Sequence, residues 1–528
     1  FWYAAGASIQ VLLFGILAIE LKRKAPNAHT FLEIIRARFG AGTHKVFLGF
    51  ALTCNMIVTG MLLLGGAAVV NGLTGMDISL AAMLIPVGVM IYTLVGGLKA
   101  TFVADYMPTV IIFIVILTFV SMVFFISPIT GGVEGMYNKL VEAASLNPVL
   151  EPTFTPGEPG NAMGAYLTMA SAGGLIFGVI NIVGNFGTVF VDQAYWQRAI
   201  AAQPSATVKG FLLGGMCWFA IPFTLATTMG LTAVALDVAL TPEQVQLGLV
   251  VPAAASVLMG EIGAILVLVM LFMAVTSAGS AELIAVSSLI TYDVYRTYKN
   301  PKATGKQLLK VSRGVIVAFG LGMGMLAVVL LGMGLSLGFV YLAMGILIGS
   351  AVIPIALTIT WSRTTRSGAV AGAIIGVMLS LLTWTSVASA ESGGVIDIAS
   401  LGGAFPMLYG NVVAILSSGL ICVVISLAQN KKYDWKELDQ HLSLVTDDMS
   451  GDAAAELVKR EQDEVQLKKA FKFSLKGGGL LTLIVIIFWP MPLYFSGYVF
   501  DYGFYGLWVG IAITWVSIAS AFIIGLPI

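Results

Sequence analysis

The sequence predicts an all-α integral membrane protein. Of its 528 residues, 58% are hydrophobic and only 10% are charged, and the mean hydropathy is +0.96. Soluble domains are about 45–50% apolar and about 25% charged, so this composition excludes a soluble enzyme and a disordered chain. The net charge is zero and the basic residues form no extended cluster, which gives no support for nucleic-acid binding. The partner that this composition requires is a lipid bilayer.

Apolar segments long enough to cross that bilayer recur along the whole chain. A membrane-spanning helix needs about 20 consecutive, mostly apolar residues. The segments that meet this requirement are, in order, 1–21, 46–71, 77–95, 102–127, 164–189, 210–236, 256–290, 314–332, 337–361, 368–389, 407–428, 477–496 and 503–526. The sequence therefore predicts about thirteen spans.

The basic residues orient these spans. If the first connection lies in the cytoplasm and the sides alternate, 26 of the 27 Lys and Arg residues fall on the cytoplasmic side, and only Lys139 lies outside. Cytoplasmic loops of membrane proteins carry such an excess of Lys and Arg. Loops 22–45, 291–313 and 429–476 are therefore predicted to be cytoplasmic, and loop 128–163 is predicted to be external.

Residues with metal-binding or redox chemistry are few. The three cysteines lie singly in apolar segments, without CxxC or His spacing, so neither a disulfide framework nor a metal site is predicted. His29, His44 and His441 fall in predicted polar connections, where solvated side chains are expected. No HExxH motif occurs. We expect no enzymatic activity and no cofactor.

Span 164–189 is rich in glycine and carries Asn181 and Asn185 one helical turn apart. Glycine weakens helix continuity, and transporters use discontinuous helices near the midplane to expose backbone groups. Polar side chains at this depth are costly unless they face a cavity or a partner. A broken helix at a solute site is therefore expected. The alternative is close helix packing through Gly174 and Gly178, which are four residues apart.

The order of the spans favours a transporter built from inverted repeats. The five spans within 164–361 begin outside, so an opposing repeat of five would have to begin inside. Only four spans precede them and the first also begins outside, so one further helix is expected before residue 1. The predicted parts are 1–127, a first repeat lacking its first helix; 128–163, an external loop; 164–361, the second repeat; and 362–528, extra C-terminal helices with the cytoplasmic loop 429–476.

Several motifs resemble those of the sodium:solute symporter family. They are YTLVGGLKA (92–100), TFLEIIRARFG (30–40), VDQAYWQRAIAA (191–202) and AVSSLITYDVYR (285–296). Longer stretches, among them CWFAIPFTLATTMGLTAVAL (217–236), resemble the urea-active-transporter branch of that family. The resemblance covers almost the whole chain. It implies the leucine-transporter-type bundle, with ten helices in two inverted repeats, a preceding helix and extra C-terminal helices.

The resemblance also implies an activity. We expect a multi-pass plasma-membrane protein that imports urea by secondary active transport with alternating access, coupled to protons. Two alternatives stay open: sodium-coupled symport of another small neutral or zwitterionic solute, and a passive urea channel. The only accessory species expected is the coupling ion, H⁺ or in the alternative Na⁺, and the oligomeric state is left open.

The family's sodium site implies a role for Ala274, Ser277 and Ala278 of span 256–290. Family members that use sodium usually carry hydroxyl groups at both positions of the adjacent pair. The alanine at 278 supplies no oxygen ligand to a hard cation. Glu282 lies one turn further along the same helical face. Because ionisable residues within spans are usually functional, Glu282 is predicted to carry the proton; the alternative is a carboxylate that reaches the cytoplasmic interface or pairs with a neighbouring base.

Urea is planar, with four N–H donors and one carbonyl acceptor, so its site needs acceptors, a donor and an apolar wall. By alignment with the family's motif, Asn185 falls at a substrate-lining position, with Asn181 one turn earlier. In span 46–71 the aligned position is Thr59, with Asn55 one turn earlier. Tyr341 is expected to close the site. For each of these residues, ordinary interhelical hydrogen bonding is the alternative.

Asp192 and Gln193 follow span 164–189 directly and are predicted to form a cytoplasmic gate. Asp192 could instead cap the next helix or pair with a base, and Asp105, near the cytoplasmic end of its own span, is expected to do one of these.

Overall fold

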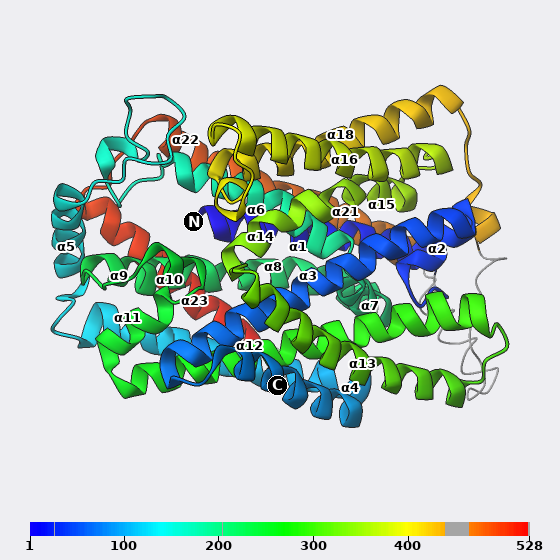
Figure 1. Cartoon of the computed structure of the whole chain (residues 1–528), viewed down its shortest axis with the longest axis horizontal. Helices are drawn as coiled ribbons and strands as arrows, with labels where there is room; N and C mark the ends of the chain where they lie inside the picture. Colours follow the sequence, from blue (N-terminus) through cyan, green and yellow to red (C-terminus); the bar gives the residue numbers. More distant parts are fainter. Residues whose placement is uncertain (26, 203, 439–463, 526–528) are drawn as a thin grey trace.

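A computed structural model describes residues 1–25, 27–202, 204–438 and 464–525. The described chain is almost entirely helical (Figure 1), and its β-structure is confined to two isolated bridges, Asn161–Ser171 and Thr168–Val499. Thirteen of its helices are long and apolar enough to cross a membrane. The all-α class and the number of spans predicted from the sequence are thereby confirmed.

The helices of the first half are α1 (Trp2–Lys24), α2 (Phe31–Phe39), α3 (Ala41–Thr74), α4 (Ile78–Ser121), α5 (Gly132–Leu146), α6 (Ala172–Phe190), α7 (Gln193–Ala201), α8 (Pro204–Leu225), α9 (Leu231–Ala235), α10 (Pro242–Gln246) and α11 (Val250–Met259). Those of the second half are α12 (Glu261–Ser288), α13 (Gly305–Gly332), α14 (Leu337–Ile348), α15 (Val352–Thr360), α16 (Arg366–Glu391), α17 (Ile398–Leu401), α18 (Ala404–Gln429), α21 (Glu464–Leu483), α22 (Pro490–Phe495) and α23 (Tyr502–Gly525). The π-helical segment η4 (Leu289–Lys299) prolongs α12.

Short polar side chains start many of these helices. Thr30, Asp192, Thr304, Ser336 and Thr365 each accept a hydrogen bond from a backbone N–H in the first turn of the helix that follows. Such caps satisfy donors that the helix itself leaves unpaired. The capping role considered for Asp192 is therefore confirmed.

The two ends of the bundle correspond to the two predicted sides. Figure 1 places α5, which lies in the predicted external loop, together with α10 and α11 at one end of the molecule. It places α2, which lies in the predicted cytoplasmic loop 22–45, at the other end. The long axis of the molecule thus runs along the direction in which the spans cross the bilayer.

Helix α4 is longer than predicted. It runs without interruption over 44 residues, where two separate spans were expected. A straight helix of that length would measure about 66 Å, roughly twice the thickness of the hydrocarbon core. Within this stretch lie two separate apolar spans, Ile78–Gly96 and Asp105–Ile126. The predicted pair of spans is present, but the helical hydrogen bonding continues between them.

The prediction of a broken helix in span 164–189 is wrong. The helix there, α6, is continuous, and it begins only at Ala172. Its glycines serve close packing instead: a Cβ atom added at Gly174 would lie 2.8 Å from Trp2 Cδ1, and one at Gly184 would lie 2.6 Å from Met344 Cε. Small residues let helix backbones approach in this way. The interruption falls in span Leu337–Thr360, where a 3₁₀ turn at Gly349–Ala351 separates α14 from α15.

The cytoplasmic loop before the last two spans is shorter than predicted. Helix α21 begins at Glu464 and its apolar span covers Leu467–Phe495, so the helix starts well before the predicted residue 477. Lysine stems pack along a helix while their ammonium groups reach water, so the lysines in this stretch do not end it. The part of the predicted loop from 439 to 463 lies outside the described residues.

Candidate functional site

Three residues predicted for substrate binding meet between α6 and α14. Asn185 Nδ2 donates to Tyr341 Oη (2.9 Å) and to the Asn181 carbonyl oxygen (2.8 Å). The Tyr341 hydroxyl donates to Asn181 Oδ1. Asn181 Nδ2 in turn donates to the carbonyl oxygen of Tyr3 in α1 (2.8 Å). We call Tyr3, Asn181, Asn185 and Tyr341 the amide cluster.

Aromatic rings surround the amide cluster. The Tyr3 ring centroid lies 5.9 Å from that of Phe177, 5.9 Å from that of Tyr341 and 5.8 Å from that of Trp218. Phe177 and Tyr341 stack with an interplanar angle of 21°. The sequence analysis did not single out Phe177 or Trp218. Phe177 could have been found, since it lies one turn before Asn181 on α6, whereas Trp218 is brought in from α8 by the tertiary structure.

The other two predicted substrate residues bond elsewhere. Asn55 Nδ2 donates to Asp192 Oδ1 (2.7 Å) and to Glu282 Oε2 (2.6 Å). Thr59 Oγ1 donates to the carbonyl oxygen of Asn55 (2.8 Å). Asn55, Asp192 and Glu282 are all buried, and we call these three the carboxyl cluster. The structure thus places Asn55 beside the predicted proton carrier and the predicted gate, and Glu282 is buried against the amide of Asn55.

The predicted gate residues hold separate contacts. Asp192 Oδ1 also accepts from the backbone N–H of Ala194 (2.7 Å), and Gln193 Nε2 donates to the carbonyl oxygen of His29 (3.2 Å). Burial raises the pKa of Asp192, and the hydrogen bonds that it accepts only partly oppose this effect. Asp192 therefore lies in an environment that favours its protonated form.

The residues aligned with the family's sodium site show one specific contact. Ser277 Oγ donates to Asp105 Oδ1 (2.6 Å), and the other oxygen of Asp105 pairs with Arg198 Nη2 (2.9 Å). The pairing expected for Asp105 is confirmed, and Ser277 bonds this carboxylate and not its own helix. Ala274 is exposed and Ala278 is half-buried. Within the described ranges, no group of three or more His, Cys, Asp or Glu side chains is arranged to hold a metal ion.

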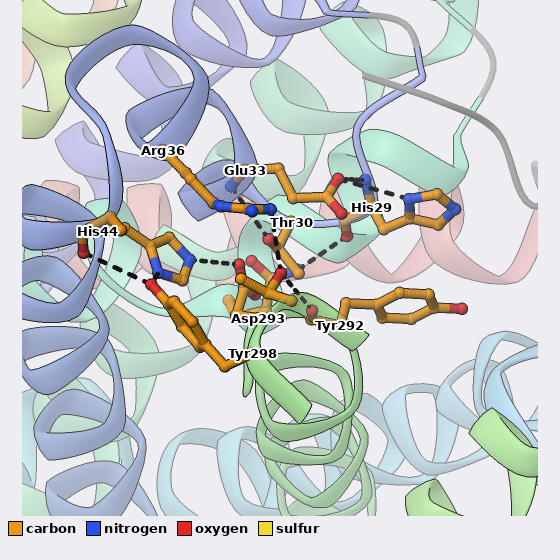
Figure 2. A network of polar contacts seen from close by, with 11 residues as sticks. His29, Thr30, Glu33, Arg36, His44, Tyr292, Asp293 and Tyr298 are labelled. Atoms are coloured by element: carbon orange, nitrogen blue, oxygen red, sulfur yellow. Dashed lines mark hydrogen bonds and ion pairs between the residues drawn. The ribbon is translucent and has the colours of Figure 1, made fainter. Parts of the chain in front are cut away.

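A third polar network lies where η4 meets α3, at the predicted cytoplasmic end (Figure 2). His44 Nε2 lies 2.8 Å from Asp293 Oδ1, and His44 Nδ1 lies 2.7 Å from Tyr298 Oη. The side chains of His44 and Asp293 are fully buried. The prediction of a solvated His44 is therefore wrong, because the π-helical continuation of α12 covers it.

His29 lies in the same region on the connection before α2. Its ring stacks on Tyr292 at a centroid distance of 4.6 Å, and its backbone N–H donates to Glu33 Oε2 (2.7 Å; Figure 2). Burial alone would raise the pKa of Glu33, but the hydrogen bonds and charge of His29 outweigh it and lower that pKa. His29 is half-buried, and His441 lies outside the described residues.

Thirteen membrane spans enclose an uncharged polar cluster with aromatic walls, and buried carboxyl groups lie on the helices beside it. This arrangement defines a multi-pass membrane transporter of small solutes. The profile of the "Sodium:solute symporter family" matches residues 1–376. The chain belongs to the sodium:solute symporter family.

Curated relatives match over the whole chain. The chain is 50% identical over 534 residues to the "Urea-proton symporter DUR3" of Oryza sativa subsp. japonica, covering 100% of this chain and 73% of that protein. It is 44% identical over 529 residues to the "Probable urea active transporter 1" of Schizosaccharomyces pombe, covering 98% of this chain and 76% of that protein.

A solved structure confirms the fold class. The chain resembles a Na⁺-coupled sialic acid symporter in a substrate-bound outward-open state, with a TM-score of 0.54 and 17% identity, covering 80% of this chain and 90% of that one. The leucine-transporter-type bundle expected from the sequence is thereby confirmed. The division into repeats and the helix expected before residue 1 stay predictions.

Proposed function

We propose that the chain is a plasma-membrane secondary active transporter that imports urea together with protons. The observation that carries this proposal is the amide cluster, because its chemistry complements urea. The amide groups of Asn181 and Asn185 and the hydroxyl of Tyr341 offer both acceptors and donors within one small region. The similarity over the whole chain to proteins named urea transporters supports the same substrate.

The form of the cluster favours a flat, neutral solute. The rings of Tyr3, Phe177 and Trp218 present apolar faces beside the amide groups. The four members of the cluster carry no formal charge, so a neutral solute leaves no unpaired ion in the site. Urea, once bound, would replace hydrogen bonds that the cluster now makes within itself.

Proton coupling is the more favourable of the two coupling modes. Sodium requires several oxygens held together, and Ala278 supplies none from its side chain. The neighbouring hydroxyl of Ser277 is already bonded to Asp105. A proton requires only one titratable group, and Glu282 lies buried in α12 against Asn55. We therefore assign the coupling role to Glu282. Transport requires no catalytic step and no cofactor.

Uptake of labelled urea by cells that express the full-length protein tests the proposal. Uptake should rise with an inward proton gradient at constant sodium and should not change when sodium is replaced at constant pH. A protein that carries labelled urea only down its gradient at every pH would be a channel. A requirement for sodium at constant pH would favour the sodium-coupled alternative.

A further inference from the structure

We propose that Asp192 and Glu282 bind the coupling proton jointly, as a carboxyl pair bridged by Asn55, and that the protonated pair holds the cytoplasmic half of the bundle closed. The inference rests on the proposed function as a proton symporter. It adds a second acid, a bridging amide and a mechanical consequence to the role of Glu282.

The geometry of the carboxyl cluster carries the inference. One amide nitrogen, Asn55 Nδ2, lies 2.7 Å from Asp192 Oδ1 and 2.6 Å from Glu282 Oε2. Because both oxygens contact the same nitrogen, the two carboxyl groups are close neighbours. The exposed fractions are 0% for Asn55, 1% for Asp192 and 4% for Glu282. Two carboxylates this close and this dry cannot both be ionised, so one proton is shared between them.

The bridging amide favours a single remaining negative charge. Asn55 directs its amide N–H groups at the two acids, and each such bond stabilises a carboxylate oxygen. In the described part of the chain, Asn55 Oδ1 has no hydrogen-bond partner. The amide is therefore oriented towards acceptors, which is the arrangement that suits one carboxylate and one carboxylic acid and not two carboxylic acids.

The charged and titratable groups around the pair do not change its single negative charge. Cys54 on α3 and Tyr195 on α7 are titratable groups that interact electrostatically with the pair. Arg198, also on α7, contributes positive charge, but its guanidinium makes its ion pair with Asp105 (2.9 Å). The pair is thus stabilised mainly by its own proton, by Asn55 and, at Asp192, by the backbone N–H of Ala194.

Loss of the proton has a structural consequence. The cluster joins α3, the N-cap of α7 and α12, which are three separate elements in the cytoplasmic half of the bundle. When the proton leaves to cytoplasmic water, two negative charges remain side by side in a low-dielectric interior and repel each other. Their separation moves the start of α7 away from α12. Proton release and opening towards the cytoplasm are then one event.

The experiment compares wild type with Asp192→Asn and Glu282→Gln, reconstituted as full-length protein in lipid vesicles. One assay measures exchange of labelled urea for unlabelled urea without a pH gradient. The other measures accumulation of urea driven by an inward proton gradient. Both variants mimic the protonated pair, which holds the cytoplasmic half closed, so we expect them to lose both exchange and gradient-driven accumulation. Variants that retain exchange would overturn the closing role of the pair. Glu20→Gln, which alters another buried carboxyl group, one that pairs with Arg23 and Lys24 on α1, is the matched control and should still accumulate urea.

The outcomes separate the two proposals. Absence of urea exchange and accumulation in wild type would overturn the proposed function itself. A wild type that accumulates urea, together with variants that accumulate it equally well, would overturn the carboxyl pair alone. Loss of accumulation in Glu20→Gln as well would show a general effect of removing buried acids, which also contradicts the pair. Because a misfolded variant would lose both activities as well, Glu282→Asp decides: the pair predicts retained accumulation with a shifted pH midpoint, and an unchanged midpoint rejects it.

Discussion

His44 and Asp293 are separated by 249 residues in sequence, yet His44 Nε2 lies 2.8 Å from Asp293 Oδ1 and both side chains are fully buried. The contact joins the first turn of α3 to η4, at the predicted cytoplasmic ends of two spans (Figure 2). A buried polar pair of this kind is stable only while both partners are present. The pair therefore ties the first predicted repeat to the second.

Removal of one partner of this pair should destabilise the protein strongly. His44→Ala leaves the Asp293 carboxyl group buried without its partner, for which we expect a loss of about 3–5 kcal/mol in the free energy of unfolding. Thermal unfolding of the detergent-solubilised protein measures the effect. His29→Ala, which alters a half-buried histidine of the same region, should cost much less. Equal unfolding temperatures for His44→Ala and wild type would contradict the prediction.

The contact between His29 and Glu33 should make stability depend on pH in the acidic range. The pKa of Glu33 is lowered in the folded protein, since the contacts of His29 outweigh the effect of burial. A lowered carboxyl pKa contributes stability above the unfolded value of about 4.3, and this contribution is lost as the pH falls through the folded value. Glu33→Gln should therefore be less stable than wild type at neutral pH, and the difference should shrink as the pH falls below about 4.3 and vanish only below the lowered folded value. A difference in unfolding temperature that stays constant with pH would argue against this role.

Asn185→Ala tests the amide cluster as the urea site. Loss of one polar partner of a bound ligand typically costs about 1–3 kcal/mol, which corresponds to roughly 5- to 150-fold in affinity. The concentration of urea for half-maximal uptake should rise by that factor while the amount of protein in the membrane stays the same. Asn411→Ala is the matched control, because this buried asparagine bonds the carbonyl oxygens of Leu342 and Met407 instead. Half-saturation at the wild-type concentration would remove Asn185 from the site.

A hydroxyl group restored at position 278 tests the coupling ion. Wild-type uptake should be nearly indifferent to sodium, since Ala278 provides no side-chain oxygen. Ala278→Ser places a second hydroxyl group beside Ser277, and stimulation of uptake by sodium is the expected gain. Ala264→Ser, nearer the start of the same helix, should give no such gain. Sodium-dependent uptake by the wild type at constant pH would show that other oxygens complete a sodium site.

Cysteine labelling tests the orientation of the bundle. Asn300 follows η4 in the predicted cytoplasmic loop 291–313, and Glu158 is exposed in the predicted external loop 128–163. Glu158 is preferred to its neighbour Gly157, whose φ of +88° would strain a cysteine. A membrane-impermeant thiol reagent added outside should label Glu158→Cys and not Asn300→Cys. The native cysteines are buried or half-buried, which keeps the background low. Labelling of both positions from outside would invalidate the predicted sides.

The spans, their number and the proximity of Asn181 to Asn185 could all be predicted from the sequence. Each depends on a local property, because a run of about 20 apolar residues suffices for a span and a separation of four residues places two side chains on one helical face. The family motifs added the fold and pointed to Asn185, which the structure brings into contact with Tyr341. The prediction of a broken helix from the glycines of span 164–189 failed, because glycine occurs both at helix breaks and where helices pack closely. Only the neighbours of these glycines, Trp2 and Met344, distinguish the two roles.

The partners of the polar side chains were decided by the tertiary structure alone. Asn55 lies one helical turn before Thr59 and was predicted with it to bind urea. It bonds Asp192 and Glu282 instead, because α3, α7 and α12 converge there. His44 lies in a polar stretch of sequence, and it is buried because η4 folds across α3. Contacts between residues 137 or 249 positions apart leave no periodic signal in the chain. Apolar length and helical period are properties of one segment, whereas the cost of burying a charge depends on which other segments surround it.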